Sequence, residues 1–168
     1  MTNAHVVAGV TQQQAVTTVA GRRLPATVVF YDPQVDVAVL YVPGLNLTPL
    51  RFAGQANPGD NAVVAGFPLN ARSLHTAAAR IGGIHNAQGP NIYQTSTVTR
   101  QIYEIRAVVE SGNSGGPLLS PEGTVDGVVF AAAVGVGDTG FALTAAQVSA
   151  DARAGEQSTS AVSTMECD

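Results

Sequence analysis

The chain has 168 residues and a net charge of −4; 45% of its residues are hydrophobic and 12% are charged. This balance fits one globular domain, or two small barrels that share a core, and it excludes an intrinsically disordered chain. The charge is spread without blocks, which argues against a nucleic-acid or anionic-membrane surface. We expect neither a membrane span nor a signal peptide within these residues.

Short runs rich in Val, Ile and Thr, separated by turns of Gly, Pro and Asp, predict an all-β chain. We expect strands at residues 14–19, 24–31, 36–42, 61–68, 76–84, 92–101, 103–109 and 125–133, with a long connection at 43–58. Thr144 and Gln147 have the form of a capping box, which predicts a helix over 145–154 that stops at Gly155. The polar residues 156–168 predict a mobile tail.

Residues 112–119 contain the clearest chemical motif of the sequence. Two glycines after Ser114 let the backbone turn tightly, and Pro117 fixes φ where the chain leaves the turn. A serine on such a turn exposes its Oγ, and the N–H groups of Gly112 and Ser114 can converge on one point, as an oxyanion hole requires. The plainer alternative is a glycine-rich hairpin that happens to contain a serine.

Gly112-Asn113-Ser114-Gly115-Gly116-Pro117-Leu118 resembles the nucleophile loop of the chymotrypsin-fold serine proteases, with Asn113 where many members have Asp. Residues 2–7 resemble the segment around the general base of that family, and residues 36–42 resemble the segment that begins with its orienting Asp. The order His5, Asp36, Ser114 is the chymotrypsin order. The resemblance implies an all-β fold of two six-stranded antiparallel barrels with a short C-terminal helix.

The same resemblance implies a serine endopeptidase that works through an acyl-enzyme. A serine hydroxyl needs a base, and the base needs an orienting carboxylate. These roles fall to Ser114, His5 and Asp36, with the N–H groups of Gly112 and Ser114 as the oxyanion hole. No cofactor is expected.

Three other titratable residues are weaker candidates for the site. Asp32 could orient the base, but an Asp before Pro33 usually serves the turn. We expect His75 and His85 on the surface or at strand ends. Neither has metal-ligand spacing with Cys, Asp or Glu, so the sequence does not support a metal site.

Residues 112–116 also fit Gly-x-Ser-x-Gly, the nucleophile elbow of α/β-hydrolases. That fold requires a helix after the serine and a histidine further along the chain. Pro117 and the strand-like sequence behind it oppose the helix, and no histidine follows Ser114. This alternative is therefore rejected.

In the family, residues just before the nucleophile and the strand after it line the primary substrate pocket. By that comparison Val108 lies near the base of the pocket, and Val129, Phe130 and Ala131 lie at its walls. No acid stands where trypsin-like enzymes bind Arg or Lys. Because burying an unpaired cation is costly, we expect a medium-sized apolar residue before the scissile bond. The same residues could instead belong only to the barrel core.

The resemblance also implies how the chain divides. We expect an N-terminal barrel over residues 1–68, a C-terminal barrel with its helix over 69–155, and the tail over 156–168. The family has further strands before the His motif, whereas His5 almost directly follows Met1. We therefore expect the first barrel to be incomplete at its N-terminus, in a truncated fragment that could be inactive.

Within the family, the sequence most resembles the membrane-anchored acid-resistance serine proteases of mycobacteria, and next the HtrA-like proteases. The features are Ile105-Arg106-Ala107, Asp138-Thr139-Gly140-Phe141-Ala142-Leu143-Thr144 and a late cysteine. The resemblance implies a periplasmic or extracytoplasmic domain, tethered by transmembrane helices upstream, that acts on proteins or peptides. Cys167 could form a disulfide with a cysteine upstream of this chain, or remain an unpaired thiol.

One function of another class stays open at this point. The chain could be a pseudoprotease, a β-barrel module that binds peptides without cleaving them. An intact set of triad residues speaks against this alternative, and the expected loss of the first strands speaks for an inactive fragment.

Overall fold

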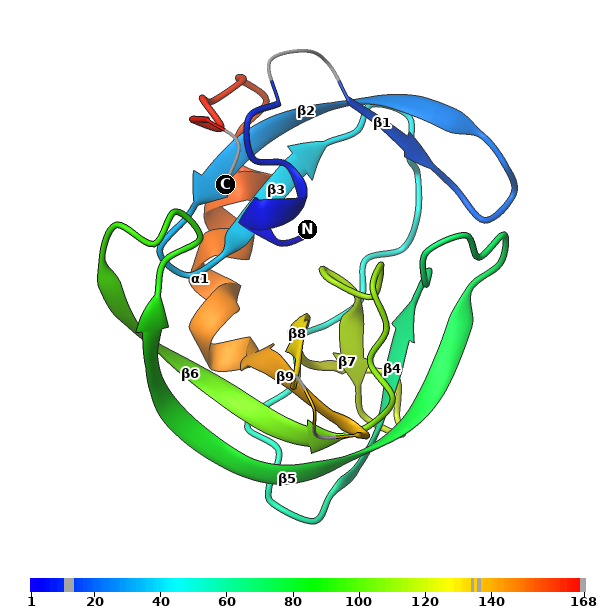
Figure 1. Ribbon diagram of the computed structural model, residues 1–168. Coiled ribbons are helices and arrows are strands. Elements are labelled where there is room, and N and C mark those ends of the chain that lie inside the picture. Colours follow the sequence, from blue (N-terminus) through cyan, green and yellow to red (C-terminus); the bar gives the residue numbers. More distant parts are fainter. Residues whose placement is uncertain (11–13, 134, 136, 167–168) are drawn as a thin grey trace. The chain divides into compact units, whose positions relative to one another are not determined.

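The computed structural model describes residues 1–10, 14–133, 135 and 137–166 (Figure 1). Their elements are η1 (Ala4–Val6), β1 (Gln14–Thr17), β2 (Arg23–Asp32), β3 (Val37–Tyr41), β4 (Asn61–Gly66), β5 (His75–Pro90), β6 (Thr97–Arg106), β7 (Pro117–Leu119), β8 (Val125–Ala132), β9 (Thr139–Thr144) and α1 (Ala145–Glu156). The chain forms two compact units. Unit 1 comprises Met1–Pro49, Pro90–Val98 and Ala150–Asp168, and unit 2 comprises Leu50–Gly89 and Thr99–Ser149.

Unit 1 contains a three-stranded antiparallel sheet in the order β1-β2-β3. Burial alternates along β1, whereas consecutive residues of β2 (Val28, Val29) and of β3 (Val37, Ala38, Val39) are buried, so these two strands are covered on both faces. Val7, Val28 and Ala38 form a small buried cluster. Asp32 accepts hydrogen bonds from the N–H groups of Gln34 and Val35 at 2.7 and 3.1 Å, so its carboxylate serves the turn before β3, as expected.

The residues after α1 are held against unit 1, so the predicted mobile tail is wrong as far as residue 166. The N–H of Val162 donates to the carbonyl of Val28 at 3.0 Å, and the N–H of Gly9 donates to the carbonyl of Thr164 at 3.1 Å. Thr164 is 4% exposed, and its hydroxyl donates to the carbonyl of Val10. These pairings between distant segments leave no local signal in a Ser/Thr-rich sequence. Cys167 lies outside the described residues.

Unit 2 is a closed barrel with the strand order β4-β5-β6-β9-β8-β7 (Figure 1). The barrel closes where Val63 and Val64 of β4 pair with Leu119 and Leu118 of β7. The strand β4 lies before the predicted boundary at residue 68, yet it contributes to this barrel. The largest fully buried side chains of its core are those of Tyr103, Ile81, Ile105, Leu118, Val64 and Val129.

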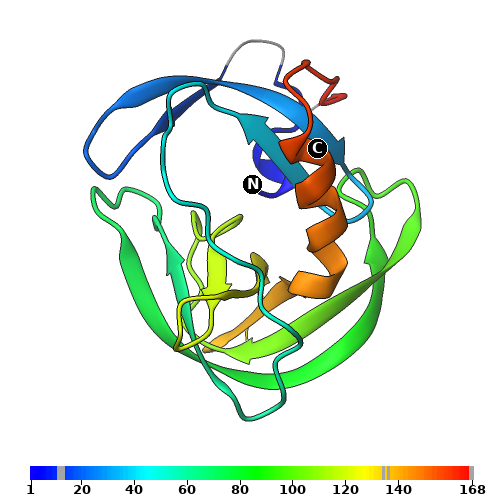
Figure 2. The ribbon, with the colours of Figure 1, turned by 180° about the vertical axis from the view of Figure 1, so that it is seen from behind.

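The helix α1 follows β9 directly and is drawn in orange to red in Figure 2. Thr144 caps it by accepting the N–H of Gln147 at 3.2 Å. The helix continues through Gly155, where we expected it to end. A Cβ on Gly155 would lie 2.4 Å from Cβ of Val39, so this glycine permits close packing. No helix within the described residues is long and apolar enough to cross a membrane.

Candidate active site

His5 and Asp36 form a hydrogen-bonded pair in unit 1. Nδ1 of His5 lies 2.8 Å from Oδ2 of Asp36, and the backbone N–H of His5 donates to Oδ1 at 2.9 Å. The side chain of Asp36 is 6% exposed and that of His5 is 30% exposed. A carboxylate at Nδ1 favours the tautomer with the proton on that nitrogen, which leaves Nε2 as a proton acceptor. The pair therefore has the arrangement of a general base and its orienting group.

Asn3 supports this pair, a role that the sequence analysis missed. It is fully buried, and its Nδ2 donates to the backbone carbonyl of Asp36 at 2.9 Å. Asp36 has φ of 71°, a left-handed conformation that is uncommon outside glycine and needs support from its surroundings. Paired backbone bonds between Thr2 and Ala38, both 2.9 Å, join the same two segments. An amide side chain two residues before a candidate base was the available signal.

Backbone hydrogen bonds hold the nucleophile loop of unit 2 on both sides of Ser114. The N–H of Asn113 donates to the carbonyl of Glu110 at 3.0 Å, and that of Gly116 donates to the carbonyl of Asn113 at 2.9 Å. The N–H of Gly115 donates to the carbonyl of Val129 on β8 at 2.8 Å. Ser114 itself is half-buried. Ser114 thus lies on a turn that is hydrogen-bonded to β8 after the serine and to Leu69 before it.

The peptide group between Ser111 and Gly112 has a defined orientation. The N–H of Leu69 donates to the carbonyl of Ser111 at 2.7 Å. In a planar trans peptide the C=O and the following N–H point in opposite directions, so the N–H of Gly112 faces away from Leu69. Within the described residues, the N–H groups of Gly112 and Ser114 form no hydrogen bonds. Both donors are thus unpaired among the described residues, as the predicted oxyanion hole would require.

Gly112 cannot be replaced without moving the loop. Its φ is 99°, and a Cβ would lie 2.5 Å from the carbonyl oxygen of Phe67 and 2.8 Å from the nitrogen of Leu69. The buried Asn113 packs in the same way on Gly66, where a Cβ would meet its Oδ1 at 2.6 Å. Residues 66–69 were predicted only as the end of one barrel and the start of the next; in the structure they support the nucleophile loop.

The predicted triad is divided between the two units. The structure brings His5 and Asp36 together, although 31 residues separate them. It forms the loop that carries Ser114 and Gly112 separately in unit 2. The catalytic roles of these residues stay a prediction.

The residues predicted for the substrate pocket have different environments. Val129 is fully buried in the barrel core, so its backbone rather than its side chain borders the nucleophile loop. Val108 is 53% exposed and Ala131 is half-buried, while the ring of Phe130 lies against that of Phe141, with 6.5 Å between their centroids. Val108 lines a cavity of about 440 Å³ together with Ala78, Arg106, Ala107, Gly137, Asp138 and Thr139.

The remaining histidines lie on the surface, as expected. His75 is the exposed first residue of β5, and Nε2 of the exposed His85 lies 3.7 Å from Oε2 of Glu104. Among the residues that the structure describes, no three His, Cys, Asp or Glu side chains are grouped so that they could hold a metal ion.

Comparison with known proteins places the chain in a family. Residues 1–128 match the model of the trypsin-like peptidase domain. The chain is 50% identical over 151 residues to the serine protease Rv3671c of Mycobacterium tuberculosis, covering 88% of this chain and 37% of that protein. It is 34% identical over 148 residues to a probable periplasmic serine endoprotease, DegP-like, of Chlamydia pneumoniae, covering 85% of this chain and 29% of that protein. The chain thus spans about a third of the length of these curated relatives.

Solved structures give the same result. The crystal structure of the active form of the Rv3671c protease from M. tuberculosis matches with a TM-score of 0.93 and 45% identity, covering 99% of this chain and 72% of that one. The HtrA-type protease AlgW with a decapeptide matches with a TM-score of 0.76 and 28% identity, covering 93% and 47%. The predicted all-β chymotrypsin fold and the predicted resemblance are both confirmed. The chain belongs to the trypsin-like peptidase family of serine proteases.

Proposed function

We propose that the chain is a serine endopeptidase domain that hydrolyses peptide bonds through His5, Asp36 and Ser114. The observation that carries the proposal is the 2.8 Å contact between Nδ1 of His5 and the buried carboxylate of Asp36. A surface histidine needs no such partner, whereas a general base does. Membership of the trypsin-like peptidase family supports a serine nucleophile, and the proposal assigns this role to Ser114 on the loop that follows β6.

The chemistry follows from these positions. Nε2 of His5 takes the proton of the Ser114 hydroxyl as Oγ attacks the scissile carbonyl carbon. The N–H groups of Gly112 and Ser114 stabilise the negative oxygen of the tetrahedral intermediate. The intermediate collapses to an acyl-enzyme as His5 returns the proton to the leaving amine. Water, deprotonated by His5, then releases the acid and restores Ser114.

The proposed substrate is a protein or peptide with a medium-sized apolar residue before the scissile bond. Phe130 and Ala131 directly follow Val129, whose carbonyl accepts the N–H of Gly115 in the nucleophile loop. Their side chains are uncharged, and Val108 adds an exposed apolar surface before the loop. These four residues remain the proposed substrate pocket.

The proposed location is the periplasm or another extracytoplasmic compartment. The name of the C. pneumoniae relative supports a periplasmic site of action for that protein. Tethering to a membrane through a segment outside this chain, and a disulfide between Cys167 and an upstream cysteine, remain part of the proposal. No observation favours a non-catalytic peptide-binding role.

Peptide cleavage by purified variants tests the proposal. A mixed peptide library is incubated with the wild-type chain and with Ser114→Ala, His5→Ala and His85→Ala, and the products are identified by mass spectrometry. We expect Ser114→Ala and His5→Ala to abolish cleavage with unchanged unfolding curves, and His85→Ala, which replaces an exposed histidine, to cleave normally. Cleavage that persists in Ser114→Ala would remove the assignment.

A further inference from the structure

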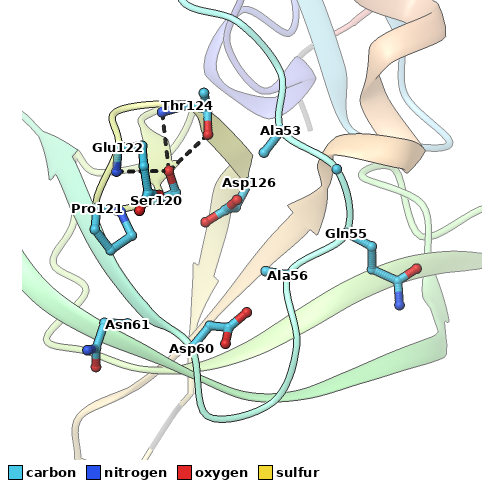
Figure 3. A pocket seen from close by; sticks show the side chains of 11 residues that line it. Ala53, Gln55, Ala56, Asp60, Asn61, Ser120, Pro121, Glu122, Thr124 and Asp126 are labelled. Atoms are coloured by element: carbon cyan, nitrogen blue, oxygen red, sulfur yellow. Dashed lines mark hydrogen bonds between the residues drawn. The ribbon is translucent and has the colours of Figure 1, made fainter.

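A second polar cavity lies in unit 2 at the end of β7 that is remote from Ser114. The strand β7 leads from the nucleophile loop to the hairpin turn at residues 120–124. This turn and the loop at residues 53–56 enclose a cavity of about 440 Å³, shown in Figure 3. Asp60, Asn61 and Asp126 complete its lining. The mouth of a β-barrel is a common location for a ligand site.

Asp126 is the unusual residue of this cavity. It is only 4% exposed, and Figure 3 shows its carboxylate directed into the space between the two loops. In the described part of the chain its carboxylate has neither a hydrogen-bond donor nor a cationic partner. Burial raises the pKa of Asp126, and the charges of Asp60 and Glu122 raise it further. Buried carboxylates in proteins are normally paired, so this one lacks an expected partner.

The residues around Asp126 add further negative charge and do not neutralise the charge of its carboxylate. Asp60 uses one oxygen, Oδ2, to accept the N–H of Asn57 at 2.8 Å, and it forms no ion pair with a described residue. The hydroxyl of the fully buried Tyr103 accepts the N–H of Ala56 at 2.9 Å. Burial raises the pKa of Tyr103, and the charges of Asp126 and Asp60 act in the same direction. Neither Asp60 nor Asp126 forms an ion pair with a described residue.

The walls of the cavity are already fixed. Oγ of Ser120 lies 2.9 Å from Oγ1 of Thr124 and accepts the N–H of Glu122 at 3.2 Å. On the opposite side, the N–H of Ala53 donates to the carbonyl of Val125 at 2.8 Å. A preformed site loses little conformational entropy when a ligand binds.

We propose that this cavity is a binding site for the guanidinium group of an arginine side chain presented by a protein or peptide partner. A guanidinium offers five N–H donors in a plane, and a carboxylate accepts two of them side by side. It is also more weakly hydrated than an ammonium group, so it enters a buried site more readily. Within the described residues the acids are not grouped as a metal ion would require. Ala53, Ala56 and Pro121 offer apolar surface to the aliphatic stem.

Binding of a small probe to the full chain tests this inference. N-acetyl-arginine methylamide is titrated into the wild-type protein, followed by NMR, beside the matched probe in which neutral citrulline replaces arginine. We expect the arginine probe to bind in the millimolar range and to shift the amide signals of residues 53–56 and 120–127. The citrulline probe should bind at least about tenfold more weakly, because it lacks the charge.

Variants then assign the binding to the carboxylate. Asp126→Asn should weaken the arginine probe about tenfold or more, whereas Glu156→Gln, an exposed acid at the end of α1, should leave it unchanged. Unfolding curves show that each variant is folded, and Asp60→Asn provides a second test within the cavity. Equal binding of the two probes to the wild-type protein, no shifts with either probe, or displacement of the arginine probe by Ca²⁺ at low concentration would overturn the proposal.

Discussion

The hydrogen bond from the N–H of Leu69 to the carbonyl of Ser111 gives the sharpest prediction on catalysis. At 2.7 Å it holds the peptide group whose other end is the N–H of Gly112. Leu69→Pro removes the donor, since proline has no N–H. The ring would also displace the carbonyl oxygen of Ser111, so the peptide group between Ser111 and Gly112 would turn its N–H away from the proposed oxyanion hole.

The backbone conformation at residue 69 is compatible with proline, although the ring Cδ would stand where the N–H now meets the carbonyl oxygen of Ser111. The N–H of Ala71 donates to the carbonyl of Pro68 at 2.8 Å, and Asn70 has φ of 69°, which is the pattern of a type II turn with Leu69 in its second position. Proline is favoured at that position. The Leu69 side chain is 73% exposed, so its loss removes little packing. Leu69→Ala keeps the N–H and is the matched control.

The expected fall in kcat of Leu69→Pro has a lower and an upper limit. Loss of one backbone hydrogen bond lowers the free-energy preference for the present orientation of the Ser111–Gly112 peptide group by about 1 kcal/mol, which is about fivefold in the population of that orientation. Complete loss of one oxyanion donor lowers kcat by about 100- to 1,000-fold. We therefore expect kcat of Leu69→Pro to fall at least about fivefold below that of Leu69→Ala, with KM little changed because the donor acts mainly on the transition state.

The assay is the steady-state hydrolysis of one chromogenic peptide substrate by the wild type and both variants. Equal kcat values in Leu69→Pro and Leu69→Ala, with both proteins folded, would refute the argument that residue 69 orients the oxyanion hole. An inactive wild-type chain would instead contradict the proposed function itself. The two failures are therefore distinguishable.

Three further predictions concern other parts of the molecule. Asn3→Ala leaves the carbonyl of Asp36 without its hydrogen-bond donor, so urea titration should show the free energy of unfolding falling by about 1–3 kcal/mol. Steady-state kinetics should show a lower kcat with KM unchanged. An unchanged kcat would show that Asn3 does not position the His5–Asp36 pair. The rate of peptide cleavage should decline as the pH falls from 8 to 5, because an imidazole, whose reference pKa is about 6.5, accepts a proton only in its neutral form. A flat pH–rate profile would contradict the role of His5. Burial raises the pKa of Asp126 in the folded protein, so ionisation of this carboxyl destabilises the fold above that raised pKa. The effect disappears once the pH falls below 3.8, the ordinary value of the carboxyl, because the group is then protonated in both the folded and the unfolded state. Asp126→Asn should therefore be more stable than the wild type in urea at about pH 7, and the difference in stability should shrink at about pH 4.

Much of the fold could be predicted from the sequence, because strands and turns leave local signals. The runs that became β2, β3 and β8 show apolar residues bounded by Gly, Pro or Asp. The role of Asp32 in its turn followed from the proline after it. Long-range pairing was harder to predict. Nothing in the sequence near Thr164 indicates that its backbone pairs with Gly9, and Gly155 serves close packing on Val39 rather than a helix stop.

In the candidate site, too, local features could be predicted from the sequence and long-range contacts could not. Short motifs around His5, Asp36 and Ser114 were sufficient to predict the pair that the structure forms and the turn that carries the serine. The supporting contacts were missed, because they join segments distant in sequence through backbone groups. The N–H of Leu69 and the carbonyl of Ser111 have no side-chain signature. Asp60 and Asp126 likewise meet only through the closure of the barrel.

The central claim is that Ser114 is an activated nucleophile whose base is His5. Its most direct test is the rate of covalent labelling by a fluorophosphonate probe, followed by intact mass and by peptide mapping of the adduct. We predict one adduct per chain on Ser114, with a labelling rate that falls by orders of magnitude in His5→Ala and is retained in His85→Ala. A folded wild-type chain that gains no adduct, or gains it on another residue, would contradict the account.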